Sequence, residues 1–183
     1  MTDLEKVKQD SCALQFVENQ TPEICLEAVK HNGNALQFVK NQTEEICLKA
    51  VKQDCCALGY VKNQTEEMCL EAVKQWGYAL QLVKNQTEEI CLLAVKQDCY
   101  ALEYVKKQTE KICLEAVKQW GFALRLVKNQ TPEICLEAVK RNKESIKYIS
   151  HNLIIKMLSA SVKPEIINND FENISRFEIM DLE

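Results

Sequence analysis

Apolar and polar residues follow a pattern that repeats every 22 residues along most of the chain. In the copy that starts at Thr43, the stretch ICLKAV at residues 46–51 places apolar side chains on one broad helical face. A second group, ALGYV at residues 57–61, echoes it after a short break. Apolar spacings of three and four residues are typical of amphipathic helices. Each copy therefore predicts two short helices joined by a turn.

Capping residues mark the expected ends of these helices. Threonine precedes the first helix of each full copy and is a good N-cap, and proline follows it at Pro22 and Pro132. Glycine directly after the first helix, as at Gly77 and Gly121, predicts a left-handed C-cap. In alternate copies an aspartate at the break is expected to cap the second helix instead: Asp10, Asp54 and Asp98.

A fixed period of this length is typical of a stacked repeat array. We predict an all-α fold, an α-solenoid of about six and a half 22-residue helix-turn-helix repeats with a C-terminal helical cap. The tandem repeats are expected over residues 1–152, with a partial copy at 1–20 and a degenerate one at 131–152. Residues 153–183 are expected to form capping helices and an acidic tail. Full copies start at Thr21, Thr43, Thr65, Thr87 and Thr109.

The break between the two helices has a longer period of its own. Asp-Ser, Asp-Cys and Asp-Cys alternate with Asn-Gly, Trp-Gly and Trp-Gly, so the full step is 44 residues. There are two explanations: either the array arose by duplication of pairs of repeats, or alternate copies have different roles. The sequence is compatible with both explanations.

The ten cysteines predict buried thiols rather than a metal or catalytic site. Equivalent atoms of stacked helices lie about 8–10 Å apart, whereas a disulfide needs Cα atoms within about 7 Å. Cys55 and Cys56 are adjacent, but zinc patterns need a second ligand pair. A cysteine nucleophile needs a neighbouring base, and the two histidines, His31 and His151, are poorly placed for that role. We expect no catalytic residue, no metal and no cofactor, hence no enzyme.

Charge and hydropathy limit the possible partners. The net charge of -4 disfavours nucleic acid, and no apolar run reaches the roughly 18 residues of a membrane span. The charged N-terminal segment lacks the apolar core of a secretory signal, so an intracellular location is expected. Lysines recur at two positions of the repeat. They are expected to lie at the C-terminal ends of the helices and to pair with glutamates of the next repeat.

Positions that differ between copies are the candidates for a binding surface. Large aromatic residues gather at and just after the break, where interface anchors are often found; the alternative is that they fill gaps between repeats. We predict a non-enzymatic scaffold that binds an unidentified protein. The alternatives are a lipid-binding amphipathic protein and a self-assembling structural protein, and the oligomeric state stays open. The candidate contacts are Trp76, Tyr78, Tyr100, Trp120 and Phe122.

The wording CLEAVKQWGYALQLVK at residues 69–84 resembles the short helical repeats catalogued as domain of unknown function 4116. The resemblance covers about residues 4–150. This family is abundant in giant viruses of amoebae, the relatives of Mimivirus. The resemblance implies a helical repeat without an assigned activity, and a viral protein in the host cytoplasm.

Overall fold

A computed structural model describes residues 1–159 and shows only helices in that range. Each repeat contains one α helix followed by a shorter 3-10 helix, which confirms the predicted all-α solenoid with units of about 22 residues. The α helices of the array are α1 (Asp3–Gln9), α2 (Pro22–His31), α3 (Glu44–Gln53), α4 (Glu66–Gln75), α5 (Glu88–Gln97), α6 (Glu110–Gln119) and α7 (Pro132–Arg141). The 3-10 helices are η1 (Ser11–Phe16), η2 (Gly33–Phe38), η3 (Cys55–Tyr60), η4 (Gly77–Leu82), η5 (Cys99–Tyr104), η6 (Gly121–Leu126) and η7 (Lys143–Tyr148).

The chain divides into two units. The first runs from Met1 to Tyr148 and contains the helices from α1 to η7. The expected end of the repeats at residue 152 stays a prediction. The second begins at Ile149 and contains helix α8 (His151–Ser159). The remainder of the predicted cap and acidic tail, residues 160–183, lies outside the described residues. None of the described helices is long and apolar enough to cross a membrane, in agreement with the expected lack of a span.

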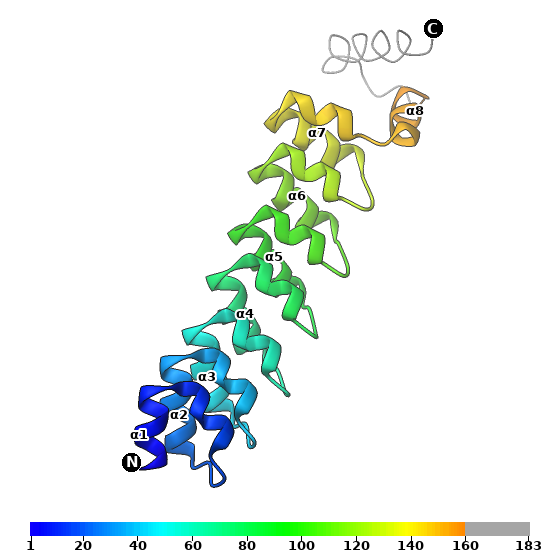
Figure 1. Ribbon diagram of the computed structural model, residues 1–183. Helices are drawn as coiled ribbons and strands as arrows, with labels where there is room; N and C mark the ends of the chain where they lie inside the picture. Colours follow the sequence, from blue (N-terminus) through cyan, green and yellow to red (C-terminus); the bar gives the residue numbers. More distant parts are fainter. Residues whose placement is uncertain (160–183) are drawn as a thin grey trace, which may run out of the picture. The chain divides into compact units, whose positions relative to one another are not determined.

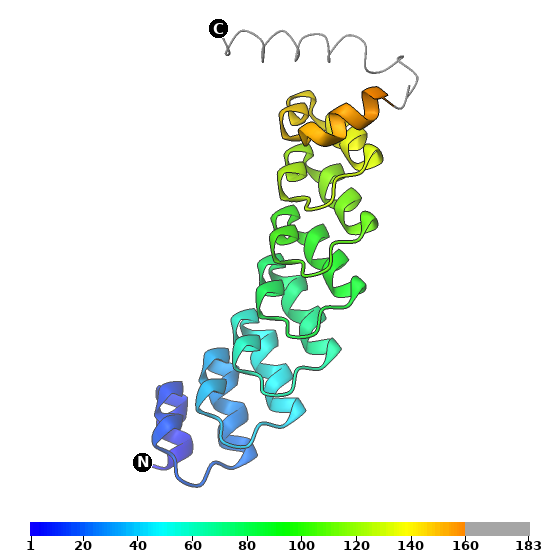
Figure 2. The same cartoon turned by 90° about the vertical axis from the view of Figure 1, so that its right-hand side faces the viewer.

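Within the first unit, the α helices lie side by side in chain order, and the 3-10 helices form a second row beside them (Figures 1 and 2). Helices this short are marginal in isolation, so they gain their stability by stacking. The core between repeats consists of small and branched apolar side chains at equivalent positions. In the repeat of α4, for example, Ala72, Val73, Ala79 and Leu80 are completely buried.

The predicted N-caps are confirmed. The hydroxyl of Thr87 accepts a hydrogen bond of 3.3 Å from the backbone N–H of Ile90, and acidic side chains occupy the first turn of α5. Carboxylates at this end of a helix are stabilised by its dipole. The same threonine cap begins each α helix from α2 to α7.

The second helix of each repeat is a 3-10 helix of six residues. The predicted aspartate caps are confirmed at its start. The carboxylate of Asp54 accepts from the N–H of Cys56 at 2.8 Å, and that of Asp98 accepts from Tyr100 at 2.9 Å. Asn32 caps its own 3-10 helix in the same way, through the N–H of Asn34.

A glutamine in each loop joins successive repeats. The Nε2 of Gln86 donates to Leu80 O at 3.3 Å in its own repeat and to Tyr104 O at 3.0 Å in the next. Its Oε1 accepts from the N–H of Lys106 at 2.9 Å and lies 3.7 Å from the Sγ of Cys91. One amide thus satisfies Tyr104 O and the N–H of Lys106 in the next repeat, and it adds a second hydrogen bond to Leu80 O, which also accepts from the N–H of Val83. Equivalent bonds to the next repeat are made by Gln20, Gln42, Gln64 and Gln108.

The expected pairing of lysines with glutamates of the next repeat is wrong for the described residues. The Nζ of Lys84 instead donates to the carbonyls of Val61 and Lys62 in the preceding repeat, at 3.0 and 2.9 Å. In the other lysine row, Lys30 pairs with Glu27 of its own helix at 3.7 Å. The lysines of the row that contains Lys84 thus donate to loop carbonyls of the preceding repeat.

The glycines do not form the predicted left-handed C-caps. The residue that caps α4 is Trp76, whose backbone is extended with φ -152°, and Gly77 starts the 3-10 helix. Glycine is needed because a Cβ at Gly77 would lie 2.6 Å from the carbonyl oxygen of Ala94 in the next repeat. The N–H of Gly77 also donates to the Oε1 of Gln97 at 2.6 Å. This close approach of the next repeat, and not a special backbone angle, explains why residue 77 is glycine.

The interfaces between repeats consequently alternate. Where glycine stands at the break, as between α4 and α5, the helices contact each other more extensively than between α3 and α4, where Cys55 takes its place. At the cysteine interface, the Nε2 of Gln75 donates to Val51 O at 2.8 Å. The 44-residue period is therefore a period of two kinds of interface.

Candidate binding face

Three aromatic rings meet where the repeats of α4 and α5 adjoin. Trp76 stacks on Tyr78 with ring centroids 5.5 Å apart, and Tyr78 contacts the ring of Tyr104 edge to face at the same distance. Trp76 is 41 % exposed, and the two tyrosines are half-buried. The group therefore joins two repeats and still presents ring surface to solvent.

Four more rings line the following three repeats. The centroid of Tyr100 lies 4.9 Å from that of Trp120, which contacts Phe122 at 5.4 Å. Phe122 meets Tyr148 edge to face at 5.7 Å. All four rings are half-buried. We call the two groups together the aromatic face, made of Trp76, Tyr78, Tyr100, Tyr104, Trp120, Phe122 and Tyr148.

Two cations lie over this face. The guanidinium of Arg125 is 5.5 Å from the centroid of Tyr100 and 5.3 Å from that of Trp120. The Nζ of Lys147 is 5.2 Å from the centroid of Phe122. Cation–π contacts at exposed sites contribute about 0.5–1 kcal/mol each. The rings are thus held in place without being covered completely.

All five residues predicted as partner contacts belong to the aromatic face. That they contact a partner stays a prediction. The rings also contact one another across repeats, as the packing alternative expected. Sequence reasoning missed Tyr104 and Tyr148. Both end a 3-10 helix, at a position that is aromatic in several copies.

The two tryptophans leave backbone donors without a cap. In the copies with aspartate or asparagine at the break, that side chain accepts from the second N–H of the 3-10 helix. Trp76 and Trp120 provide no such acceptor, so the N–H groups of Tyr78 and Phe122 have no side-chain cap. The indole N–H groups likewise have no hydrogen-bond partner among residues 1–159. Polar donors and aromatic surface therefore occur together.

The Tyr78 hydroxyl is a further donor on this face. Its pKa is raised by burial and by the nearby carboxylates of Asp98 and Glu103. The phenol therefore stays protonated at and well above neutral pH, because a raised pKa favours the uncharged form. It adds hydrogen-bonding capacity next to Trp76.

The cysteines of the array are free and mostly buried. Burial raises the pKa of Cys113 and Cys135 to about 11, so both are thiols at neutral pH. A thiol is a poor nucleophile compared with its thiolate. This chemistry suits core positions, and the absence of enzymatic activity stays a prediction.

Open hollows lie between successive loops on the glutamine side of the array. One is bordered by Lys40, Thr43, Cys47 and Lys62, and a similar one is bordered by Thr87, Cys91 and Lys106. The lysines in them already donate to loop carbonyls of the preceding repeat. These hollows are by-products of the regular stacking and are weaker candidates than the aromatic face.

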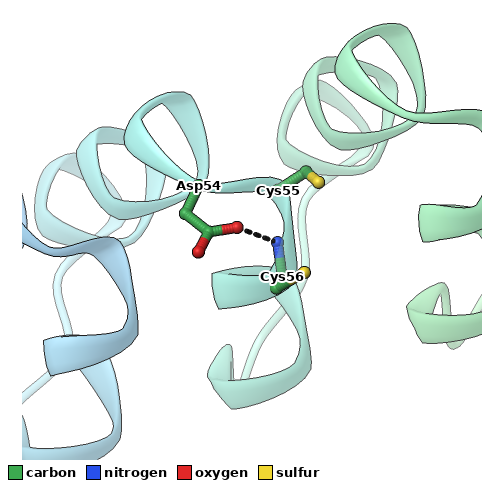
Figure 3. Close-up of side chains that lie close together, drawn as sticks. All are labelled: Asp54, Cys55 and Cys56. Carbon is green, nitrogen blue, oxygen red and sulfur yellow. Dashed lines mark hydrogen bonds between the residues drawn. The ribbon is translucent and has the colours of Figure 1, made fainter.

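A cluster of possible metal ligands stands at the break after α3 (Figure 3). One carboxylate oxygen of Asp54 and the sulfurs of Cys55 and Cys56 all lie within 4.8 Å of one another. Sequence reasoning discounted the two cysteines because it looked for a second cysteine pair. The third ligand is the capping aspartate, which the sequence places directly before them.

Comparison with known proteins identifies the repeat and no activity. A family described as "Domain of unknown function (DUF4116)" matches residues 21–65, 43–87, 65–108, 87–130 and 109–154. The five matches overlap and together cover most of the array. No curated protein and no solved structure matches the chain.

Proposed function

Because the chain belongs to the family of domain of unknown function 4116, which brings no assigned activity, we propose its role from its geometry. The protein is a non-enzymatic repeat scaffold that binds a partner protein on its aromatic face. Repeat arrays expose extended surfaces suited to this role.

The supporting observation is the combination of partly exposed rings with N–H donors that have no side-chain cap, at Trp76 and Trp120. Each tryptophan replaces a capping residue, so it removes a hydrogen bond that the other copies make. Loss of such a cap costs about 0.5–2 kcal/mol. The missing caps leave the N–H groups of Tyr78 and Phe122 beside the tryptophan rings without a side-chain acceptor. Aromatic side chains also dominate the energetics of binding interfaces.

The donors indicate the chemistry of the partner. The N–H groups of Tyr78 and Phe122 and the two indole N–H groups require acceptors. A segment in extended or polyproline conformation offers unpaired backbone carbonyls, and aromatic-lined surfaces bind such segments. We therefore expect an extended, proline-containing segment to lie across the rings of Trp76 and Trp120.

The alternatives receive less support. Lipid binding by amphipathic helices needs free apolar faces, but Ala94 and Val95 of α5 are completely buried between repeats. Among the described residues, no particular surface favours self-assembly. An intracellular location, in the host cytoplasm if the chain is viral, belongs to the proposal and is supported by the free thiols.

The test uses the two tryptophans as reporters, because the chain contains no others. A displayed library of extended peptides is selected against the full chain, and binding of each selected peptide is followed by tryptophan fluorescence and by calorimetry. We expect proline-containing peptides that perturb the fluorescence. The double variant Trp76→Ala/Trp120→Ala should lower their affinity at least tenfold, measured by calorimetry.

The matched control is Phe16→Ala. Phe16 is 79 % exposed and ends η1, far along the array from the aromatic face. Its removal should leave the affinity unchanged, and circular dichroism should show equal helicity for all variants. Failure to select any peptide, or equal affinity of the double variant and the wild type, would overturn the proposal.

A further inference from the structure

The break after α3 differs from every other break in having two thiols beside a carboxylate (Figure 3). We propose that Asp54, Cys55 and Cys56 form a binding site for a thiophilic metal ion of the Zn²⁺ or Cu⁺ class. Two sulfur ligands that each lie about 2.3 Å from a tetrahedral zinc ion are about 3.8 Å apart. The three ligand atoms already lie within 4.8 Å of one another, so side-chain rotations alone can bring them to that spacing.

The carboxylate is already oriented. One oxygen of Asp54 accepts from the N–H of Cys56 at 2.8 Å, and the other accepts from the Nδ2 of Asn34 at 2.7 Å. An ionised carboxylate has about four acceptor positions, so both oxygens keep capacity for a cation. Ligating carboxylates in metal sites are commonly held by hydrogen bonds of this kind. Asn34 therefore acts as a positioning residue from the preceding repeat.

Access and ligand type also fit. Cys55 is 9 % exposed and lies in the cysteine-type interface, whereas Cys56 is exposed on the surface. An ion can reach the exposed sulfur first and then the buried one. Soft thiolate ligands select zinc and monovalent copper over magnesium and calcium. Three protein ligands leave a coordination position open for water.

The local charges favour a cation. The negatively charged carboxylate of Asp54 lies within 4.8 Å of both sulfurs. A bound cation would release the thiol protons of Cys55 and Cys56, because metal binding requires the thiolates.

Other copies show which part is specific. The break at Asp98 has Cys99 but then Tyr100, and the break at Asp10 has only Cys12. Both keep the capped turn, with Tyr100 N–H and Cys12 N–H bound to the aspartate at 2.9 and 2.8 Å. A two-thiol site arises in one copy alone, and the other copies supply matched controls in the same chain.

The test is a titration of the reduced, full-length protein with Cd²⁺ under anaerobic conditions, followed by the thiolate-to-cadmium charge-transfer absorption. Zn²⁺ competition then measures the affinity for zinc. We expect saturation at one ion per chain, release of protons, and displacement by Zn²⁺. Cys56→Ser should weaken binding at least tenfold, because it removes one of two sulfur ligands.

Two further variants separate the ligands from the fold. Asp54→Asn keeps the cap, as Asn32 shows in its own copy, and should weaken binding less than Cys56→Ser does. Cys12→Ser removes a lone thiol from the same kind of turn and should leave binding unchanged. Circular dichroism confirms equal helicity. No saturable absorption, equal affinity of Cys56→Ser and wild type, or one ion per two chains would each overturn the proposal.

Discussion

Two kinds of break alternate in the array, and they differ in both packing and surface. In one kind, Asp98 precedes Cys99 and caps the 3-10 helix, and α5 and α6 contact each other less extensively than α4 and α5 do. Trp76 precedes Gly77 in the other, gives no cap, and lets the next α helix approach closely. The copy with Asn32 before Gly33 has the same close approach but keeps its cap, so the glycine accounts for the packing and the tryptophan for the missing cap. The comparison therefore separates two properties of the break: how closely the next helix packs, and whether the 3-10 helix is capped.

The largest expected effect comes from closing the space at a glycine break. Gly77→Ala places a methyl group 2.6 Å from the carbonyl oxygen of Ala94, so backbone must move. Overpacking of this kind costs about 1–3 kcal/mol. We expect a loss near the upper end, measured by urea unfolding monitored by circular dichroism.

The control is Gly59→Ala. A methyl group there meets only Leu82 Cδ2 at 3.5 Å, an ordinary contact. Because alanine lowers the conformational entropy of the unfolded chain, this variant should be neutral or more stable by about 0.4–1 kcal/mol. If both alanines had the same effect, close approach would not explain the glycine at residue 77.

The second-largest expected effect shows whether the two kinds of interface also differ in their loop hydrogen bonds. Gln86→Ala and Gln64→Ala each remove loop hydrogen bonds to the next repeat, one at a glycine interface and one at a cysteine interface. Buried partners left unsatisfied cost about 1–3 kcal/mol. We expect equal losses in the urea-unfolding free energy, since the loop contacts are the same in both. A clearly unequal pair would place the alternation in the loops as well.

A smaller, stabilising effect is expected at the last glycine break. The hydroxyl of Ser145 is completely buried, has no hydrogen-bond partner within the described part of the chain, and lies near Gly121. The other copies have alanine there. Ser145→Ala should raise the unfolding free energy by about 1 kcal/mol, because it removes an unsatisfied buried group. A decrease in thermal stability in calorimetry would count against this explanation.

The smallest expected change in stability is the most informative about function. Trp76→Asp restores a cap worth about 1 kcal/mol and loses the ring contact with Tyr78, worth about 0.5–1.5 kcal/mol. The two terms nearly cancel, so the urea midpoint should hardly move. Binding of a selected peptide should nevertheless be lost. If the variant still bound the peptide, Trp76 would not be part of the binding face.

The sequence was sufficient for the repeat, because copies 22 residues apart resemble one another. It was also sufficient for the helix starts and the aspartate caps, because each cap depends on residues within three positions of each other. Thr87 and Ile90 are an example. It was insufficient where the partner lies in the next repeat. Nothing in the residues around Gln86 indicates that its side chain accepts from the N–H of Lys106, 20 residues further along the chain. Gly77 suggested a left-handed cap, whereas the contact that requires it is with Ala94.

The candidate site likewise could be predicted where it depends on single positions of the repeat, but not where it depends on contacts between repeats. The five aromatic residues near the break could be selected because they vary between copies. Tyr104 and Tyr148 join them only through the stacking of adjacent repeats. The metal-ligand cluster was missed because Asp54 was considered as a cap and the cysteines were considered without it.

The proposed binding face requires that the tryptophan copies leave the N–H groups of Tyr78 and Phe122 free for a partner. The most direct measurement is amide hydrogen exchange of the full chain, resolved residue by residue by NMR. We expect the N–H groups of Tyr78 and Phe122 to exchange faster than those of Cys56 and Tyr100, because the latter two donate hydrogen bonds to aspartate side chains. Equal protection of all four amides would contradict this expectation.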